Sequence, residues 1–350
     1  MSELITNIEI KNFKSIRHQK IEGCKRITLF IGYPNVGKSN ILEALSGFSI
    51  LAKSNMPPLN ELVRFQKPID IFFNANSSEN VEISIDDKLF LNYQYSSSTT
   101  LEITIANHSK EDENALQNVE VVSYFKSFFR EKGYQIPDGF TTMGDILQIK
   151  PYKYQSLSTY YPAKDNSLLV PFGNNLQDII ETYLPFKKEV IKLFDKHNLK
   201  LLFDKSENEH KILKFLDDES YISIPMSLMA DTLHRLILYK AAIASNDNTV
   251  LLLEEPESHM FPPYISKFTS DIVHDANNNQ FFIATHSPYV LNDLMENARE
   301  DLAIYLVDYK NGETLIHKMG DEDIHDAYQF GYDFFMNIKN FMPTSVNEKV

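Results

Sequence analysis

The segment RITLFIGYPNVGKSNILEAL, residues 26–45, decides the fold of this chain. It begins with an apolar run, 26–32, that is typical of a buried strand, and it continues into a loop bounded by glycines. The residues after the loop, 40–52, carry apolar side chains at helical spacing. The segment therefore predicts a strand, a glycine-bounded loop and a helix in direct succession.

The loop satisfies the pattern G-x-x-x-x-G-K-[ST] with Gly32, Gly37, Lys38 and Ser39. Glycines let backbone N–H groups turn inward around phosphate oxygens, and the helix that begins there adds its dipole. The ammonium of Lys38 would bind the β- and γ-phosphates, and the hydroxyl of Ser39 would ligate Mg²⁺. The motif thus predicts a site for ATP and Mg²⁺ whose residues are Gly32, Tyr33, Pro34, Asn35, Val36, Gly37, Lys38, Ser39 and Asn40.

A second informative segment is VLLLEEPESH, residues 250–259. Its uninterrupted apolar run predicts a strand that is buried on both faces and ends in Glu254 and Glu255. In a nucleotide-hydrolysing protein, one such carboxylate holds Mg²⁺, directly or through water, and another orients the attacking water. By position, Glu254 is the metal-side acid and Glu255 the candidate general base. The alternative is an acidic turn after a core strand.

Strand and helix patterns alternate along much of the chain. Strand patterns occur at 69–73, 81–86, 88–95, 100–106, 199–204, 221–225 and 280–287, and helical patterns at 119–134, 174–194, 231–245, 265–276 and 324–341. The cluster of short strands near residue 90 predicts an antiparallel sheet. The alternation elsewhere predicts an α/β fold with a mostly parallel core sheet covered on both faces.

We expect four regions in the chain. They are an N-terminal lobe at 1–106, with the phosphate loop and the antiparallel strands, a helical insertion at 107–155, a C-terminal lobe at 156–319 and a helical tail at 320–350. The segment 301–323 is too short for an appended toprim nuclease domain. It is predicted to form the closing strands of the C-terminal lobe.

Four segments resemble a known group of proteins: NIEIKNFKSI (7–16), IGYPNVGKSNILEAL (31–45), LLLEEPESHMFPP (251–263) and FFIATHSPYVL (281–291). The group is the ABC-type ATPase heads with the P-loop NTPase fold. It includes RecF, the structural-maintenance-of-chromosomes (SMC) proteins, the overcoming-lysogenization-defect (OLD) nucleases and the AAA-15-like ATPases of bacterial defence and toxin–antitoxin loci. The resemblance covers about residues 1–50 and 220–310.

This resemblance implies roles for residues near the acids. The histidine after the next strand contacts the γ-phosphate in such proteins, which corresponds to His286; a structural histidine is the alternative. The segment with Ser258 and His259 resembles a loop that crosses to a second subunit, although a solvated loop would have the same composition. Many members have Asp before Glu at the strand end, whereas this chain has two glutamates.

The chain departs from the group at the Leu-Ser-x-Gly-type signature, which reaches the partner subunit's nucleotide. The corresponding segment, MSLMADTLHRL (226–236), has Met229 in place of serine and Asp231 in place of glycine; only Thr232 agrees. Asp231 is better explained as the N-cap of the following helix. Arg235 could supply charge in trans or be a solvated arginine. The departure predicts slow or partner-dependent hydrolysis.

Two further positions are weaker candidates. Members of the group often have a Mg²⁺-contacting glutamine after the first helix, and Gln66 could fill this role, although a plain loop residue is the favoured interpretation. An early-strand residue often lies over the adenine or the phosphates in similar proteins. Phe13, Lys14 and Arg17 are candidates for it, against the alternative of an exposed strand edge.

Composition limits the functional classes. The chain has 350 residues, 43% of them hydrophobic and 23% charged, as in ordinary globular proteins. The net charge of −14 argues against a chain-wide basic surface for nucleic acid but leaves room for a local one. A single cysteine, Cys24, and the lack of an apolar run of about 18 residues favour a cytoplasmic protein without a membrane segment.

Three functions remain open. The first is an ATPase whose ATP-dependent homodimer, or higher oligomer, gates a protein effector in trans, in anti-phage defence or a toxin–antitoxin system. The second is a DNA-repair or chromosome-maintenance ATPase of the RecF/SMC type. Its basis is two groups of basic residues: Lys11, Lys14, Arg17, Lys20, Lys25 and Arg26, and then Lys187, Lys188, Lys192 and Lys196. The third is a non-catalytic nucleotide-sensing scaffold, suggested by the altered signature.

Overall fold

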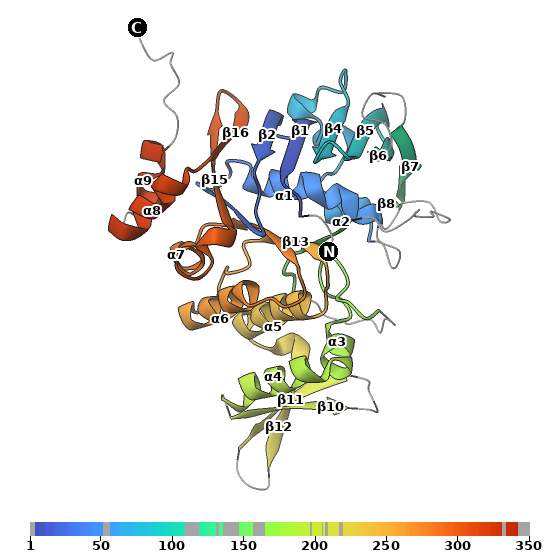
Figure 1. The fold of residues 1–350 in the computed structure, drawn as a ribbon. Coiled ribbons are helices and arrows are strands. Elements are labelled where there is room, and N and C mark those ends of the chain that lie inside the picture. Colours follow the sequence, from blue (N-terminus) through green and yellow to red (C-terminus); the bar gives the residue numbers. More distant parts are fainter. Residues whose placement is uncertain are drawn as a thin grey trace.

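The computed structural model describes residues 4–51, 57–108, 119–130, 133–135, 147–156, 165–196, 198–204, 206, 209–216, 220–330 and 334–341. Figure 1 shows helix α1 (Lys38–Ser46) beside strands of a large antiparallel sheet, with further helices and a small sheet at the other end of the molecule. Within the described residues, no helix is long and apolar enough to cross a membrane.

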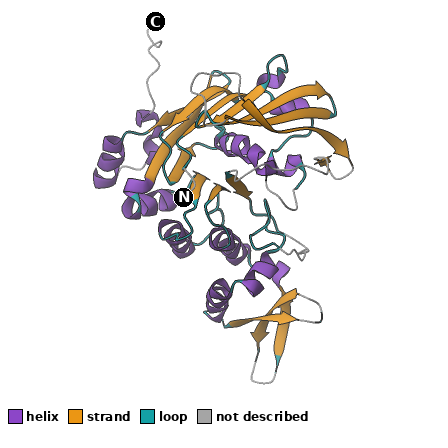
Figure 2. Ribbon diagram, turned by 45° about the vertical axis from the view of Figure 1, so that its right-hand side comes forward, coloured by secondary structure: helices purple, strands orange, loops and turns teal. Residues whose placement is uncertain are grey.

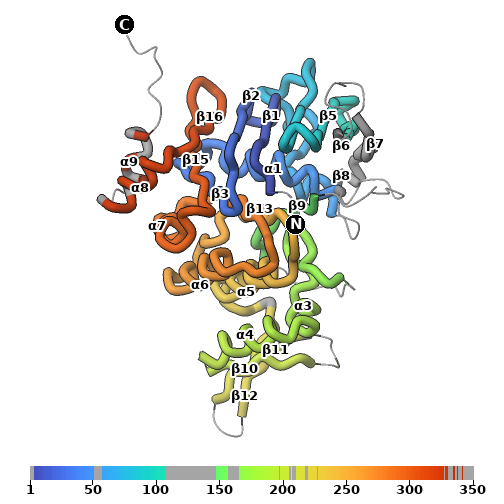
Figure 3. The backbone as a smooth tube through the Cα atoms, in the orientation of Figure 1, coloured from blue at the N-terminus to red at the C-terminus, as the bar shows by residue number. Residues whose placement is uncertain are grey.

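The core sheet has six strands in the order β16-β15-β3-β14-β13-β9. Their bounds are β3 (Ile27–Gly32), β9 (Gln148–Tyr152), β13 (Thr249–Glu254), β14 (Gln280–Thr285), β15 (Leu302–Lys310) and β16 (Glu313–Lys318). All neighbouring pairs are parallel except β15 and β16, which form the closing hairpin. Figure 3 traces how β3 and β15, from distant parts of the chain, lie side by side. The prediction of a mostly parallel core sheet is confirmed.

Two hydrophobic cores cover the two faces of this sheet. Alternate residues of β3 point to opposite cores: Leu29 packs with the helices α5 (Asp231–Ala244), α6 (Pro262–Val273) and α7 (Pro288–Asn297), whereas Phe30 packs with α1 and the antiparallel sheet. Every residue of β3 and β14 is buried. Burial on both faces explains why these strands have unbroken apolar sequences.

The antiparallel sheet has seven strands in the order β2-β1-β4-β5-β6-β7-β8. Their bounds are β1 (Asn7–Phe13), β2 (Ile16–Glu22), β4 (Val81–Ile85), β5 (Leu89–Ser97), β6 (Thr100–His108), β7 (Val119–Arg130) and β8 (Gly133–Gln135). The helix predicted at 119–134 is therefore wrong. That segment is rich in Val, Phe and Tyr, which favour strands, and β7 pairs along the edge that β6 offers.

The strand predicted at 69–73 is also wrong. The segment forms two short 3₁₀ helices, η2 (Pro68–Ile71) and η3 (Phe73–Ala75). Pro68 stands at the start of η2, where its fixed φ fits a helical turn, and the carboxylate of Asp70 accepts hydrogen bonds from the backbone N–H groups of Gln66 (3.0 Å) and Lys67 (2.8 Å). These local interactions stabilise helical turns in a segment whose apolar spacing is typical of a strand.

A third sheet, β10-β11-β12, lies at the far end of the molecule from the antiparallel sheet (Figure 2). Its strands are β10 (Leu199–Asp204), β11 (Glu209–Phe215) and β12 (Tyr221–Pro225). The helical pattern at 174–194 is interrupted at Tyr183, because Pro185 stands in the first turn of a new helix. The remaining helical elements are α2 (Leu59–Leu62), α3 (Leu176–Thr182), α4 (Leu184–Asp195), α8 (Asp321–Phe330), α9 (Phe334–Phe341), η1 (Gly47–Leu51), η4 (Met226–Leu228) and η5 (Arg299–Asp301).

The four-region division of the chain stays a prediction. The range 107–155, which the sequence suggests as an insertion, includes β9, and β9 pairs with β13 in the core sheet. The predicted tail contains α8 and α9, while residues 342–350 lie outside the described part of the chain.

Candidate functional site

The phosphate loop connects β3 to α1 at the carboxyl edge of the core sheet. Gly37, at the N-cap of α1, has a φ of +101°, and a Cβ there would lie 2.1 Å from Oγ1 of Thr314. Lys38 is buried, and its Nζ donates hydrogen bonds to the carbonyl oxygens of Gly32 (3.0 Å) and Tyr33 (2.7 Å). The loop therefore folds tightly around its own lysine.

The ammonium of Lys38 is costly to bury. Burial lowers its pKa to about 8, although the carboxylates of Glu255, Glu257 and Glu254 act in the opposite direction. A cation with a lowered pKa in a loop of this geometry is suited to a polyanion, because the anion would compensate the lost hydration.

The loop is braced from behind by two hydroxyl groups. Thr314 of β16 donates from Oγ1 to the carbonyl of Val36 (2.9 Å), and Ser15 in the β1–β2 turn bonds Oγ1 of Thr314 (2.7 Å). Asn40 at the start of α1 donates to Oγ of Ser15 (2.6 Å). Because Thr314 is fully buried, these bonds hold the loop in one conformation. Neither hydroxyl is recognisable from a local motif, since the two residues are 299 positions apart.

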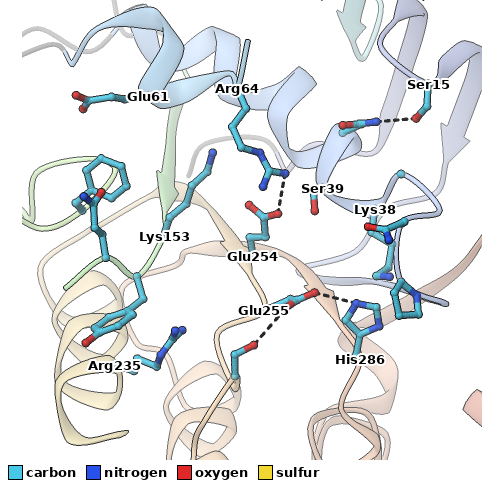
Figure 4. Close-up of a pocket in the computed structure, with 18 of the residues that line it drawn as sticks. Ser15, Lys38, Ser39, Glu61, Arg64, Lys153, Arg235, Glu254, Glu255 and His286 are labelled. Carbon is cyan, nitrogen blue, oxygen red and sulfur yellow. Dashed lines mark hydrogen bonds and ion pairs between the residues drawn. The ribbon is translucent and has the colours of Figure 1, made fainter. Parts of the chain in front are cut away.

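The paired acids lie at the end of β13, two strands from the loop in the sheet. Glu254 accepts a hydrogen bond from Nη2 of Arg64 (3.1 Å). Glu255 has a φ of +44°, which is unusual for a non-glycine residue, and its carboxylate meets Nε2 of His286 (2.8 Å) and Oγ of Ser258 (3.2 Å). Figure 4 shows Glu254 directed toward Arg64 and Glu255 toward His286.

His286 follows β14, the strand between β3 and β13. Burial lowers the pKa of His286, the ammonium of Lys38 lowers it further, and the carboxylate of Glu255 opposes both effects. The imidazole is therefore biased toward its neutral form near pH 7. The structure brings Lys38, Glu255 and His286 to one edge of the sheet, as parallel neighbouring strands must.

A third glutamate, which sequence reasoning missed, supports this arrangement. Glu257 is buried, and its Oε1 accepts hydrogen bonds from Oγ1 of Thr285 (2.5 Å) and the backbone N–H of His286 (3.2 Å). Its Oε2 has no hydrogen-bond partner among the described residues. Burial raises the pKa of Glu257. The only signal in the sequence is its place two residues after Glu255.

The phosphate loop, the paired acids and His286 contribute to the wall of one cleft of about 950 Å³. The predicted site residues in its wall are Pro34, Asn35, Gly37, Lys38, Ser39, Asn40, Glu254, Glu255 and His286. Gly32, Tyr33 and Val36 belong to the loop without lining the cleft. Its other lining residues are Ser15, Asn60, Glu61, Arg64, Lys153, Tyr154, Gln155, Phe172, Arg235, Ser258, His259 and Tyr309.

Sequence reasoning also missed a charge network that extends from the cleft wall to helix α1. Glu43 of α1 is fully buried and forms ion pairs with Lys14 and with Nε of Arg64. Burial favours its neutral form, but Lys14, Lys153 and Arg64 outweigh this and lower its pKa. Lys153 directly follows β9, whose register with β13 places it beside Glu254. Arg64 thus links the buried acid of α1 to the acid at the end of β13.

The signature segment differs from the prediction in one respect. Ala230 is the N-cap of α5, so the predicted N-cap role of Asp231 is wrong: Asp231 is the first helical residue, and its carboxylate accepts a hydrogen bond from the hydroxyl of Tyr154 (2.9 Å). The guanidinium of Arg235 lies 4.0 Å from the centre of the Tyr154 ring, in the wall of the cleft. Thr232 donates to the carbonyl of His259 (2.9 Å).

The weaker candidates lie away from the cleft. Gln66 does not line it. Phe13 is buried, Lys14 is engaged by Glu43, and Arg17 is exposed. Ser15, in the same turn, is the residue that reaches the cleft wall.

Three comparisons with known proteins bear on this site. A Helicobacter pylori protein named "ATP/GTP phosphatase" is 21% identical over 348 residues, which cover 85% of this chain and 89% of the relative. "Uncharacterized protein MJECL10" of Methanocaldococcus jannaschii is 35% identical over 108 residues, covering 27% of this chain and 46% of the relative. A solved SMC head bound to the C-winged-helix domain of ScpA has a TM-score of 0.52 at 15% identity, covering 92% of this chain and 99% of the other.

At that identity, the SMC head shows that the fold is shared. The predicted fold, the P-loop NTPase fold of ABC-type heads, is thereby confirmed. The profile of a family described as "AAA domain, putative AbiEii toxin, Type IV TA system" matches residues 27–292, which include the phosphate loop, both acids and His286. The chain therefore belongs to this AAA-domain family and is an ATPase of the AAA/SMC-head type.

Proposed function

We propose that the chain binds ATP with Mg²⁺ in the cleft and hydrolyses it, with Glu255 as the general base. The observation that carries the proposal is the meeting of Lys38, Glu255 and His286 in one cleft, although they come from three strand ends. The name of the H. pylori relative, "ATP/GTP phosphatase", supports the same reaction class.

The loop and cleft fit a nucleoside triphosphate. The volume of about 950 Å³ lies at the upper end of the range for small-molecule sites. A Cβ at Gly37 would overlap Oγ1 of Thr314, so only glycine lets the loop keep a backbone conformation in which its N–H groups can face phosphate oxygens. Lys38 would exchange its bonds to loop carbonyls for bonds to the phosphates.

Magnesium fits two oxygen donors in the cleft wall, the hydroxyl of Ser39 and the carboxylate of Glu254. Mg²⁺ is usually held by one or two such groups together with substrate phosphates and water. When bound, the ion would neutralise developing charge on the phosphates. Because Arg64 already contacts Glu254, metal binding requires this carboxylate to be shared or released.

In this proposal, Glu255 takes the proton of an attacking water. Its side chain is 43% exposed, and its carboxylate is oriented by the hydrogen bonds that it accepts from His286 and Ser258. The neutral imidazole of His286 has a single N–H donor, which faces Glu255 in the structure and would turn to a phosphate oxygen when the nucleotide binds. We assign to His286 the contact with the terminal phosphate.

We further propose that two copies of this cytoplasmic ATPase enclose the nucleotide and that the dimer gates a protein effector. His259 is exposed at the cleft, next to the N-terminus of α5, where ABC-type heads meet a partner. With Asp231 in place of the signature glycine, Arg235 is the cation available for trans activation, which fits slow or partner-dependent hydrolysis. A role in defence or a toxin–antitoxin system rests on the family description.

The decisive experiment measures phosphate release and nucleotide binding in parallel. We expect wild-type protein to release phosphate from ATP only with Mg²⁺, and Lys38→Ala to lose binding. Glu255→Gln should bind ATP while its hydrolysis falls at least about 100-fold, the usual contribution of a general base. No phosphate release by the wild type with any nucleotide, or full activity of Glu255→Gln, would contradict hydrolysis at this site and favour the nucleotide-sensing scaffold.

DNA binding is a second candidate, favoured by a groove of about 580 Å³ between α4 and α6. Its wall includes the lysines Lys192, Lys196 and Lys267, and also Lys240, which forms ion pairs with Glu189 and Asp271 of the same wall. By contrast, the basic residues near the N-terminus are largely paired with acids, as Lys11 and Lys20 are with Glu9. Affinity for duplex DNA across a salt series tests the idea, and an affinity that does not change with salt would exclude phosphate contacts at this groove.

A further inference from the structure

Tyr309, near the end of β15, is an exposed aromatic residue in the wall of the cleft. Its side chain is 48% exposed and has no ring or cation contact with another described residue. Strand β15 pairs with β3 so that Val307 lies opposite Gly32, the first residue of the phosphate loop. Tyr309 follows two residues later, so it lies beside the loop itself.

The strand order gives a direction to a triphosphate bound on the loop. The order β15-β3-β14-β13 puts His286, Glu254 and Glu255 on one side of the loop and Tyr309 on the other. The phosphate that is cleaved must lie near the acids. The nucleoside at the opposite end of the triphosphate therefore extends away from them, toward the β15 side of the loop.

The hairpin places the Tyr309 side chain on the face that holds the loop. In the register of β15 with β16, Tyr309 is directly opposite Thr314, and opposite residues of an antiparallel pair share one face. Thr314 bonds the carbonyl of Val36 and the hydroxyl of Ser15. Ser15 and Asn40 line the cleft with Tyr309. Figure 1 shows this hairpin next to β2, whose first residue follows Ser15.

The other aromatic rings of the cleft are less suited to a base. One face of Tyr154 is covered by the guanidinium of Arg235, and Tyr154 follows β9, beyond the acids. Phe172 lies in the connection after that strand. Tyr33, although 42% exposed, does not line the cleft. Tyr309 is the described aromatic residue that combines an open ring with a place on the nucleoside side of the loop.

We propose that Tyr309 is the platform on which the nucleobase stacks, beside the polar groups of Ser15 and Asn40. This inference rests on the proposed nucleotide site and adds to it the residue that recognises the base. Stacking uses the π-face that every base presents, so it tolerates different bases. Tyr309 should therefore hold adenine and guanine about equally, and a ligand without a base should gain nothing from it.

The test compares the affinities of ATP, GTP and inorganic tripolyphosphate for wild-type protein, Tyr309→Ala, Tyr309→Phe and the control Tyr221→Ala. Tyr221 is 58% exposed in β12, far from the cleft. We expect Tyr309→Ala to weaken ATP and GTP by about tenfold and to leave tripolyphosphate unchanged. Tyr309→Phe and Tyr221→Ala should bind all three ligands as the wild type does.

Three results would overturn the inference. If Tyr309→Ala binds ATP as tightly as the wild type while Lys38→Ala does not bind, the proposed site stands and the base lies elsewhere. If Tyr309→Ala weakens tripolyphosphate as much as ATP, Tyr309 supports the loop instead of the base. Failure of the wild type to bind any of the three ligands would refute the nucleotide site and the stacking together.

Discussion

At the scale of single residues, Lys38 makes a pH-dependent prediction. Its pKa is lowered to about 8 mainly by burial, so the free protein loses this charge as the pH rises through 8. Phosphates bind the charged form. We therefore expect nucleotide affinity to fall by up to about tenfold per pH unit above 8 through this group. Equilibrium titrations between pH 7 and 9.5 measure the effect.

The control is Lys38→Met, which should show no nucleotide binding at any pH in that interval. A wild-type affinity that is constant would mean that Lys38 stays protonated. The effect of pH on folding stability has the opposite direction. Because the pKa of Lys38 in the folded protein lies below its unfolded value of 10.5, the folded protein binds fewer protons than the unfolded chain between pH 8 and 10.5. The contribution of Lys38 to stability should therefore rise with pH across that interval.

Glu257 is predicted to be a positioning residue for His286. Glu257→Ala removes the oxygen that accepts from Thr285 and from the His286 backbone, so His286 and its partner Glu255 lose their alignment. We expect kcat to fall by about 10- to 100-fold with little change in KM. Glu257→Gln keeps an acceptor oxygen, and the raised pKa of Glu257 indicates that its buried site disfavours the negative charge, so this variant should remain active.

Steady-state kinetics of both Glu257 variants decide the point. If kcat falls equally in Glu257→Ala and Glu257→Gln, the reaction depends on the negative charge of Glu257 and not on the position of His286. Thr285→Val removes one of the two donors and should have a smaller effect in the same direction as Glu257→Ala.

At the scale of elements, the phosphate loop depends on one glycine. Gly37 and Gly312 both have positive φ, +101° and +86°. A Cβ on Gly37 would lie 2.1 Å from Thr314, whereas a Cβ on Gly312 meets nothing within 4 Å. Each Ala substitution should cost about 1–2 kcal/mol for its backbone conformation. Only Gly37→Ala should also displace the loop and abolish nucleotide binding.

Urea unfolding and nucleotide binding of the two variants test this pair. The loss of unfolding free energy in Gly312→Ala measures only the cost of the backbone conformation, because the hairpin turn at Gly312 is open to solvent. If Gly37→Ala bound nucleotide normally, the bracing of the loop by Thr314 and Ser15 would not matter for function.

At the scale of the whole molecule, the proposed mechanism requires two copies. We expect Glu255→Gln, which binds ATP without cleaving it, to double its mass in solution when ATP and Mg²⁺ are added. Light scattering measures the mass, and Lys38→Ala is the control that should not respond to ATP. A monomer under every condition would exclude the nucleotide-enclosing dimer and leave a single-chain cleft as the complete site.

The sequence by itself determined the features that are encoded within short contiguous segments. Residues 26–45 specify a strand, a loop and a helix, because the glycines and the apolar spacing act locally. The unbroken apolar strands before Glu254 and His286 indicate a parallel sheet buried on both faces. Once the sheet is parallel, its strand ends meet at one edge, so the acids and His286 could be assigned to the phosphate loop without knowing the strand order.

The tertiary structure decided which strands and side chains become neighbours. Apolar spacing reports that a segment is buried but not what it packs against, which is why 119–134 was predicted as a helix and 69–73 as a strand. The pairing of β9 with β13 puts Lys153 beside Glu254, and the closing hairpin brings Thr314 to the loop. Glu43, Glu257 and Tyr309 gain their significance from contacts across the fold, because no local pattern determines a long-range pairing.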